Sequence, residues 1–251
     1  DKTEYTQVAM VTACLAMTRA VESMGLHADM TAGLSLGEYC AIAVAGGMCD
    51  LDAIRTVRSR GIFMEHAAPE GSGAMSAVLG MDASVIENVL NGREGVSIAN
   101  YNCPGQIVIT GEAAAVAEAG TALKEAGARR VLPLKVSGPF HSPMMQPAGE
   151  ELAKVFAGVS MNPLKLPYVA NINAEVVTDC GKIEGLLVAQ VSGSVRWQQS
   201  VETMIREGAD TFVEIGPGKT LTGFLRKIDK NVKAYHIGSW EEAVQVCEEL
   251  K

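Results

Sequence analysis

The sequence has no long run of lysine or arginine, and its formal net charge is -8. Nucleic-acid-binding proteins present a basic face to phosphates, so this charge pattern argues against that class of function. No uninterrupted apolar stretch is long enough to span a bilayer, and the polar start, Asp1 to Tyr5, does not follow a signal-peptide pattern. We therefore expect neither a nucleic-acid partner nor a membrane partner.

Cysteines with metal-ligand spacing are also missing. The six cysteines include no C-x-x-C pair and no Cys/His cluster of the kind that binds zinc. We interpret them as free thiols in a reducing compartment, which predicts a cytoplasmic protein without a metal site. They are Cys14, Cys40, Cys49, Cys103, Cys180 and Cys247.

Apolar residues and glycine, by contrast, are plentiful. Of the 251 residues, 48% are hydrophobic, 20% are charged and 26 are glycine. These proportions are typical of a folded enzyme with a sizeable core and many tight turns. The length suits one large domain, or one domain that carries a smaller one.

The hydrophobic pattern alternates between helical and strand periodicity, which predicts the α/β class. We predict helices over residues 6–24, 37–45, 84–90, 113–126, 182–191 and 200–207, another capped by Asp50, one after residue 218 and a last one from Glu241. We predict strands over residues 30–34, 74–79, 96–101, 106–110, 130–136, 166–172, 211–215 and 234–237.

The order of these elements indicates an insertion. Residues 73–136 read β-α-β-β-α-β, which is the ferredoxin-like order, with a turn over 102–105 joining the middle strands. Residues 1–72 and 137–251 alternate strand and helix, which predicts a mostly parallel, covered sheet. We therefore expect a large α/β catalytic domain, similar to an α/β-hydrolase, with a ferredoxin-like small domain inserted into it.

Residues 33–37, Gly-Leu-Ser-Leu-Gly, fit the pattern G-x-S-x-G. They lie between a predicted strand and a predicted helix, the context in which this motif presents a nucleophilic serine on a sharp turn. Ser35 is therefore the candidate nucleophile, and the backbone N–H of Leu36 is a candidate oxyanion donor at the helix N-terminus. The alternative is that the motif forms only a structural turn.

A nucleophilic serine needs a base, and the chain has four histidines. His27 and His66 lie where surface residues are expected, and His236 sits in a late strand where a core histidine is equally reasonable. His141 lies in a rigid loop where the small domain returns to the large one, and clefts form at such junctions. His141 is the first candidate, although spacing alone leaves the choice open.

Several ordered motifs make the sequence resemble the malonyl-CoA:acyl carrier protein transacylases, in the acyltransferase family of fatty-acid and polyketide synthesis. The resemblance runs over the whole chain. The motifs are GLSLGE at 33–38, RSRGIFM at 58–64, YNCPGQ at 101–106, PFHS at 139–142 and EIGPGK at 214–219.

The resemblance implies roles for individual residues. Ser35 matches the nucleophile, His141 its base, and Arg60 the arginine that holds the free carboxylate of malonate. Gln190 matches a residue whose backbone carbonyl orients the histidine, so no Asp or Glu is nominated as a third member. Asn102 lies near the acyl pocket of the family. Without the resemblance, Arg60 would be assigned to a solvated helix face, and Asn102 is equally well explained as a turn residue.

The family relationship also implies the reaction. A malonyl group passes from malonyl-CoA to Ser35 and then to the thiol of an acyl carrier protein, without a metal or redox cofactor, and we expect the enzyme to act as a monomer. Because the net charge is negative, docking of an acidic carrier needs a local basic patch. Two candidate patches are Arg129, Arg130 and Lys135, and Arg226, Lys227 and Lys230.

Two departures from the family pattern stand out. Leu34 occupies the position before the nucleophile where the family usually has histidine. Family members typically begin with a strand and a Gly-Gln-Gly turn that supplies a second oxyanion contact, and we expect this segment to be missing upstream of Asp1.

Three other functions remain as alternatives. A polyketide-pathway acyltransferase would use the same chemistry. A serine esterase or thioesterase would use the same nucleophile, although a carboxylate-binding Arg60 argues against a general esterase. A noncatalytic protein that only binds a carrier would have no need of both Ser35 and His141.

Overall fold

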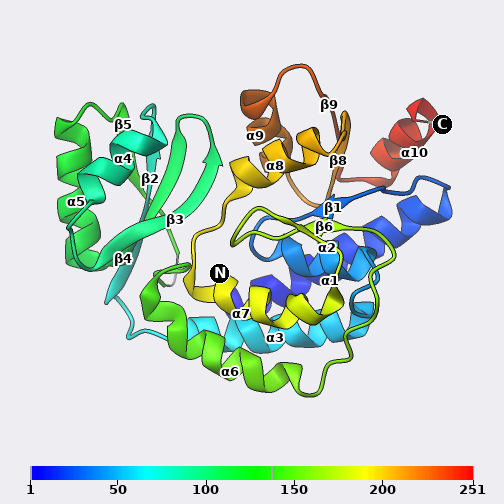
Figure 1. Cartoon of the computed structure of the whole chain (residues 1–251), viewed down its shortest axis with the longest axis horizontal. Coiled ribbons are helices and arrows are strands. Elements are labelled where there is room, and N and C mark those ends of the chain that lie inside the picture. Colours follow the sequence, from blue (N-terminus) through cyan, green and yellow to red (C-terminus); the bar gives the residue numbers. More distant parts are fainter. Residues whose placement is uncertain (1, 137, 251) are drawn as a thin grey trace.

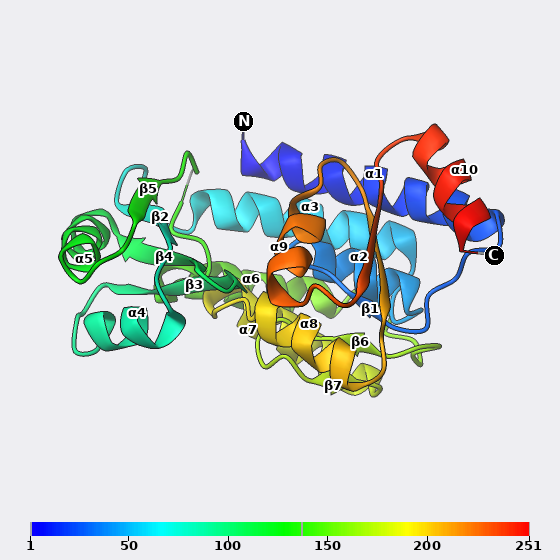
Figure 2. The same ribbon diagram turned by 90° about the horizontal axis from the view of Figure 1, so that it is seen from above.

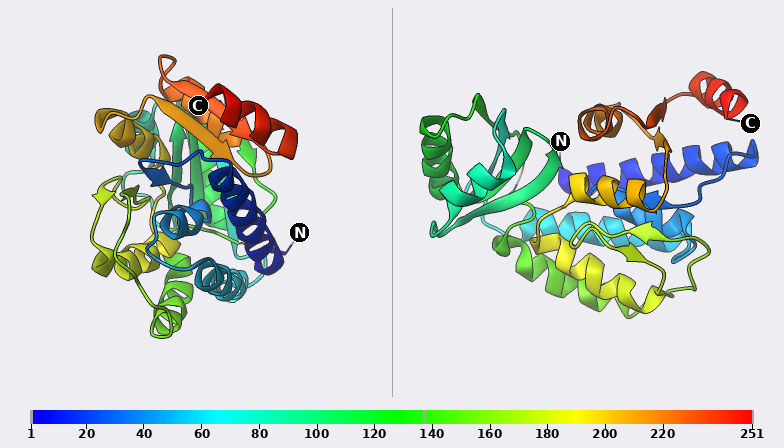
Figure 3. Two further views of the ribbon diagram at one scale, coloured as in Figure 1. Left: turned by 90° about the vertical axis from the view of Figure 1, so that its right-hand side faces the viewer. Right: turned by 45° about the horizontal axis from the view of Figure 1, so that its top comes forward.

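The computed structural model describes residues 2–136 and 138–250, so the predicted boundary residue Ser137 lies outside it, as do residues 1 and 251. The elements form two groups (Figure 1). A smaller group, β2 to β5 with α4 and α5, stands at one end of a longer body that holds all the other elements; the right panel of Figure 3 shows this separation. Helices and strands occur in both groups, which confirms the α/β class.

The longer body is built on packed helices. They are α1 (Thr3–Ser23), α2 (Gly37–Val44), α3 (Asp50–His66), α6 (Gln146–Phe156) and α7 (Ile183–Ser192). α3 packs against both α1 and α6, and α6 packs in turn against α7. Their inward residues, among them Leu15, Ile42, Val57, Leu152 and Leu187, share one core. Each such side chain contributes about 1.5–3 kcal/mol by leaving water, so this core fixes the helices around α2.

The strands of the longer body are short and form two separate sheets. β1 (Thr31–Ala32) pairs in parallel with β6 (Tyr168–Val169), which pairs in the antiparallel sense with β7 (Val176–Val177). β8 (Thr211–Ile215) and β9 (Lys233–Ile237) form a parallel pair of their own. For the described residues, our prediction of a single, mostly parallel sheet in the large domain is therefore wrong.

Two of the predicted strands are shorter because the chain turns away early. Of the strand predicted over residues 30–34, only Thr31 and Ala32 are in a strand, because the backbone bends at Gly33 into the turn before α2. Residues 166–172 keep only Tyr168 and Val169, since Ala170 N–H donates to the carbonyl of Glu175 in a tight return.

The smaller group contains β2 (Gly73–Leu79), α4 (Ala83–Leu90), β3 (Val96–Cys103), β4 (Gln106–Glu112), α5 (Ala113–Glu125) and β5 (Arg130–Pro133). Its sheet has the order β3-β4-β2-β5, and every neighbouring pair is antiparallel. Ile86 of α4 and Leu123 of α5 share one core with Ile107 and Ile109 of β4. The predicted sequence of elements is confirmed; the last strand ends at Pro133 and not at residue 136.

The hairpin between β3 and β4 differs from the prediction. Cys103 pairs with Gln106, so only Pro104 and Gly105 form the turn, and Asn102 belongs to the strand. The register shifts between Tyr101 and Cys103, which makes Asn102 the extra residue of a β-bulge. The interpretation of Asn102 as a turn residue is therefore wrong.

Other boundaries also need correction. Cys49 and not Asp50 caps α3, with its Sγ accepting a hydrogen bond from Asp52 N–H at 3.4 Å. Helix α6 and strand β7 were not predicted. The signal for α6 is present, since Ala148, Leu152 and Phe156 repeat every four residues on its buried face.

The remaining helices close the longer body. They are α8 (Trp197–Arg206), α9 (Thr220–Ile228) and α10 (Trp240–Glu249), with short 3-10 turns at η1 (Pro143–Met145) and η2 (Cys180–Lys182). α10 lies beside the end of α1 (Figure 2), where Val21 packs with Ala243 and Val246. Measured by length and apolarity, the helices of residues 2–136 and 138–250 include none that could cross a membrane.

A backbone contact joins the two groups beside α7. Tyr101 N–H donates to the carbonyl of Val195 at 2.9 Å, and Val195 N–H donates to the carbonyl of Ala99 at 2.8 Å. The segment that follows α7 therefore lies along β3, an edge strand of the small sheet. This contact fixes the smaller group next to the end of α7, where Gln190 lies.

Candidate active site

Ser35 sits on a sharp turn between β1 and α2, as the motif predicts. Its φ of 50° lies in the left-handed region, which costs a non-glycine residue on the order of 1–3 kcal/mol. Asn171 holds this conformation: its Oδ1 accepts from Ser35 N–H at 2.5 Å, and its Nδ2 donates to the carbonyl of Gly33 at 2.8 Å. The side chain of Asn171 thus spans the turn and keeps the hydroxyl presented.

The two glycines of the motif have different roles. A Cβ on Gly33 would overlap the backbone carbonyl of Gly37, so the close approach of these two residues requires glycine at position 33. A Cβ on Gly37 would meet no atom within 4 Å. Only Gly33 is therefore needed for the turn itself.

His141 approaches Ser35 from the loop that follows the smaller group. Its Nε2 lies 2.7 Å from Ser35 Oγ, and its Nδ1 lies 2.8 Å from the carbonyl oxygen of Gln190. Since a carbonyl only accepts, Nδ1 carries the proton and Nε2 is free to accept the serine proton. Burial of the ring, and secondly the charge of Arg60, lower the pKa of His141 to about 4. The ring is therefore a neutral base at neutral pH.

Arg60 lies on the buried side of α3 and not on a solvated face. Only 2% of the residue is exposed, whereas Arg55 is exposed and Arg58 pairs with Glu4 at 3.1 Å. The assignment of Arg60 to a solvated helix face is therefore wrong. Arginine keeps its proton in proteins, so a cation is buried here.

The guanidinium of Arg60 faces neutral partners. Nη1 donates to Gln7 Oε1 at 2.6 Å, and Nη2 donates to Ser35 Oγ at 3.1 Å and to Gln190 Oε1 at 3.0 Å. Arg60 forms no ion pair with any carboxylate of the described residues, and its Nε has no hydrogen-bond partner there. Burial lowers the pKa of Arg60, because a positive charge away from water is unfavourable when no carboxylate contacts it.

Gln190, on α7, contributes more than the backbone carbonyl that the resemblance implied. Its fully buried side chain accepts from Arg60 through Oε1, and its Nε2 donates to the carbonyl of Ser35 at 2.9 Å and to Glu38 Oε2 at 2.6 Å. One residue thereby connects the nucleophile, the base and the buried cation.

Leu36 and Asn102 are the remaining candidates. Within the described residues the backbone N–H of Leu36 has no acceptor, and it lies at the start of α2 where the helix dipole favours negative charge. Asn102 is 7% exposed, and no hydrogen bond between described residues joins its side chain to Ser35, His141 or Arg60. The structure thus brings Ser35, Leu36, His141, Arg60 and Gln190 together, and gives Asn102 no direct contact with them.

Four participants were not found by sequence reasoning: Gln7, Glu38, Tyr39 and Asn171. Glu38 offered a signal, because it is an acid inside an otherwise apolar, buried helix. Asn171 lies two residues after the end of the buried strand β6, but its partner Ser35 is 136 positions away. Tyr39 lies 5.6 Å below the guanidinium of Arg60 as a cation–π partner, and no local pattern distinguishes it or Gln7.

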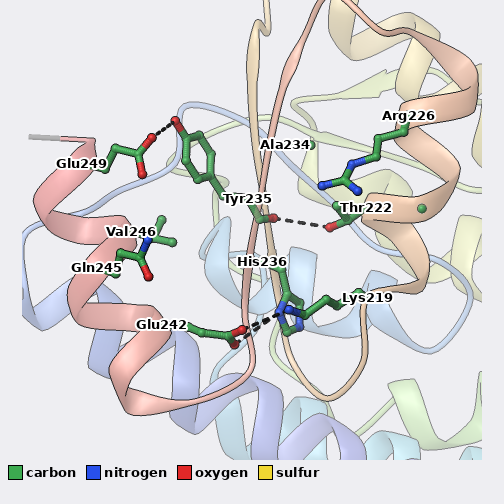
Figure 4. Close-up of a pocket in the computed structure, with 11 residues that line it drawn as sticks. Lys219, Thr222, Arg226, Ala234, Tyr235, His236, Glu242, Gln245, Val246 and Glu249 are labelled. Carbon is green, nitrogen blue, oxygen red and sulfur yellow. Dashed lines mark hydrogen bonds and ion pairs between the residues drawn. The ribbon is translucent and has the colours of Figure 1, made fainter.

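The other histidines lie elsewhere. His27 and His66 are exposed. His236 lines a cavity of about 280 Å³ between α9, β9 and α10 (Figure 4), with its Nε2 3.0 Å from the carbonyl of Gly216. Glu242 in the same cavity contacts both Lys219 and His236, at 3.1 and 3.3 Å. None of Ser35, His141 and Arg60 lines this cavity, so it is separate from the serine site.

The comparisons with known proteins agree on one family. A family described as "Acyl transferase domain" matches residues 1–246. The malonyl CoA-acyl carrier protein transacylase of Bacillus subtilis (strain 168) is 42% identical over 249 residues, which are 98% of this chain and 78% of that protein. The enzyme of the same name from Escherichia coli (strain K12) is 44% identical over 91% of this chain and 75% of its own length.

Solved structures give the same result. The malonyl CoA-acyl carrier protein transacylase of Clostridium perfringens superposes with a TM-score of 0.96 at 39% identity, covering 99% of this chain and 79% of that one. A malonyl transacylase in complex with a type II PKS acyl-carrier protein superposes with a TM-score of 0.93 at 38% identity, over 99% of this chain and 82% of that one.

Proposed function

The chain belongs to the acyl transferase domain family, and from that premise we propose that it transfers a malonyl group from malonyl-CoA to the phosphopantetheine thiol of an acyl carrier protein. One observation carries this function: His141 Nε2 and Arg60 Nη2 converge on Ser35 Oγ at 2.7 and 3.1 Å. A nucleophile with both a neutral base and a buried cation beside it suits an acyl group that ends in a carboxylate. The product supplies malonyl groups for fatty-acid synthesis.

In the first half of the reaction Ser35 takes the acyl group. The hydroxyl proton passes to His141 Nε2 while Oγ attacks the thioester carbonyl carbon. The N–H of Leu36 stabilises the resulting oxyanion. The carbon–sulfur bond then breaks, the CoA sulfur takes the proton from His141, and malonyl-Ser35 remains.

The second half reverses these steps with a different thiol. His141 removes the proton from the phosphopantetheine thiol, and the sulfur attacks the malonyl-serine ester. The bond to Oγ breaks, and His141 returns the proton to Ser35. The backbone carbonyl of Gln190 accepts the hydrogen bond from His141 Nδ1–H throughout, so the ring keeps one orientation in both halves. CoA takes part as a thioester substrate, and the steps call for no metal or redox cofactor.

Arg60 gives the site its preference for malonyl. The carboxylate of malonate neutralises the buried guanidinium, whereas an acetyl group offers it only a methyl group. An unpaired buried charge is costly, so Arg60 favours the substrate that brings an anion.

A labelling experiment tests this function. We expect radiolabelled malonyl-CoA to leave one stable label on the wild-type chain and none on Ser35→Ala, whose fold is checked by circular dichroism. Added carrier protein should remove the label and become malonylated. Release of the label as free malonate, with no malonyl-carrier formed, would instead identify a thioesterase, and a labelled Ser35→Ala would reject the nucleophile.

The helices and strands also support a division of the chain into two domains. We propose that residues 73–136 form a ferredoxin-like domain inserted into an α/β-hydrolase-like domain of residues 1–72 and 137–251. The order β3-β4-β2-β5, its antiparallel pairing and the separate core of the smaller group support this division. The strand–serine–helix turn at Ser35 supports the likeness of the longer body to α/β-hydrolases.

We also propose a cytoplasmic location and a monomeric enzyme. All six cysteines lie within the described residues and are free thiols, which fits a reducing compartment. Light scattering coupled to size-exclusion chromatography tests the oligomeric state, and a mass of twice the chain would reject the monomer.

A further inference from the structure

Glu38 is a buried acid close to the nucleophile in the chain, and its backbone N–H donates to the carbonyl of Ser35 at 3.2 Å. It lies in the first turn of α2, and only 1% of the residue is exposed. Its Oε2 accepts from Gln190 Nε2 at 2.6 Å and from Asn171 N–H at 3.3 Å, whereas Oε1 has no partner among the described residues. Both partners belong to the site, since Asn171 holds the Ser35 turn and Gln190 holds His141.

The carboxamide of Gln190 stands between this acid and the buried cation. Its Nε2 donates to Glu38, and its Oε1 accepts from Arg60 at 3.0 Å. Glu38 and Arg60 therefore share one buried cluster, yet they form no ion pair. A charged pair in such a site would normally be in direct contact, because each partner offsets the desolvation of the other.

Burial, and not the groups that face Glu38, favours the neutral form of this acid. Burial, only partly opposed by Gln190, Asn171 and Arg60, raises the pKa of Glu38 to about 8. Tyr39 of α2 and Tyr168 of β6 also lie near it, and burial raises the pKa of both phenols, so they stay neutral too. At neutral pH the cluster then holds one net charge, that of Arg60.

We propose that Glu38 acts as a neutral acid that anchors Gln190 and leaves the charge of Arg60 to the carboxylate of the substrate. Glu38 is then a positioning residue that determines the preference for malonyl. In its ionised form it would neutralise Arg60 from within the protein and repel the malonyl carboxylate. This inference rests on the proposed malonyl transfer.

The inference predicts a pH dependence that separates two substrates. Acetyl-CoA uses Ser35 and His141 but brings no carboxylate, so the ratio of acylation rate constants, malonyl over acetyl, reports only on the cluster around Arg60. That ratio should fall roughly tenfold as the pH rises from one unit below the pKa of Glu38 to one unit above it. The pKa of His141 is lowered to about 4, so this base does not titrate in that range.

The test measures single-turnover acylation by both substrates across this range in wild type, Glu38→Gln, Glu38→Ala and Glu118→Gln. Glu118, exposed on α5, is the control for removal of a negative charge far from the site. We expect the ratio to fall in wild type and Glu118→Gln, and to stay level in Glu38→Gln, whose amide oxygen can still accept from Gln190. Glu38→Ala, which removes the anchor, should acylate more slowly than Glu38→Gln with both substrates.

A ratio that stays level in wild type, or that falls equally in Glu38→Gln, would overturn the inference. So would a Glu38→Gln variant as slow as Glu38→Ala, because the charge of Glu38 would then be essential. Thermal unfolding of each variant shows whether slow acylation reflects a lost fold. If wild type itself accepts no malonyl group, the proposed function fails. If wild type accepts malonyl but the malonyl-over-acetyl ratio of its acylation rate constants does not depend on Glu38, only the inference about Glu38 fails.

Discussion

At the scale of single residues, the proposed nucleophile and the proposed base share an uncommon backbone conformation. Ser35 and His141 have φ values of 50° and 61°, in a region that most residues avoid. Each has a polar partner from a distant part of the chain: Asn171 binds the backbone of Ser35, and the carbonyl of Gln190 accepts a hydrogen bond from the ring of His141. In this arrangement Ser35 Oγ lies 2.7 Å from His141 Nε2.

The pH profile of acylation tests the state of His141. The lowered pKa means that the ring accepts a proton only near pH 4, and the protonated ring is no longer a base. Acylation by malonyl-CoA should therefore stay level from neutral pH downward and fall through about pH 4. His141→Ala should be slower by about 10²–10⁴-fold. A fall centred near the ordinary histidine pKa, about 6.5, would contradict a buried neutral base.

Sequence reasoning found the proposed reacting residues but not the residues that support them. Ser35 came from a local motif, His141 first from its loop at the junction and then from a resemblance, and Arg60 and the backbone of Gln190 from the resemblance alone. Glu38 and Asn171 contact partners more than a hundred positions away, and Gln7 reaches Arg60 from another helix. Such contacts depend on tertiary packing, and local patterns in the sequence do not predict which distant residues will pack together.

At the scale of elements, the turn between β1 and α2 depends on one glycine. Gly33→Ala would place a methyl group against the backbone of Gly37, so the turn must open. We expect a loss of more than about 2 kcal/mol in the free energy of unfolding, together with loss of acylation.

The matched control is Gly37→Ala, where a methyl group meets no neighbour within 4 Å. Alanine favours a helix over glycine by about 0.5–1 kcal/mol, so this variant should be as stable as wild type or slightly more stable. Urea denaturation measures both. Equal destabilisation of the two variants would show that the close approach at Gly33 does not define the turn.

Elements with strong periodicity were the ones predicted well. The smaller group has clear alternation, and its element order was confirmed. The strands at 30–34 and 166–172 were too long because apolar composition continues past the residues that pair, while Gly33 and Ala170 already turn. α6 was not predicted, although its apolar residues repeat at helical spacing and a proline stands in its first turn, where helices favour it.

At the scale of the whole molecule, the two groups meet along β3 and the segment after α7, and each carries exposed basic residues. Arg129, Arg130 and Lys135 belong to the smaller group, and Arg226, Lys227 and Lys230 lie on or after α9. Since the net charge is -8, we expect an acidic carrier to dock through such local patches.

Charge reversal tests this docking. We expect reversal of either patch to raise the KM for carrier protein and to reduce its dependence on salt, while acylation by malonyl-CoA stays unchanged. Arg93→Glu, an exposed arginine outside both patches, is the control. If both reversals leave KM and salt dependence untouched, carrier docking uses another surface.

The preference for malonyl is tested most directly at Arg60. The measurement is the ratio of kcat/KM for malonyl-CoA over acetyl-CoA in wild type, Arg60→Ala and Arg55→Ala; Arg55 is an exposed residue of the same helix. A charge-assisted hydrogen bond contributes about 1.5–3 kcal/mol, so Arg60→Ala should lower the ratio by about one to two decades. Arg55→Ala should leave it unchanged. A ratio in Arg60→Ala equal to that of wild type would contradict the role of the buried guanidinium in binding the malonyl carboxylate.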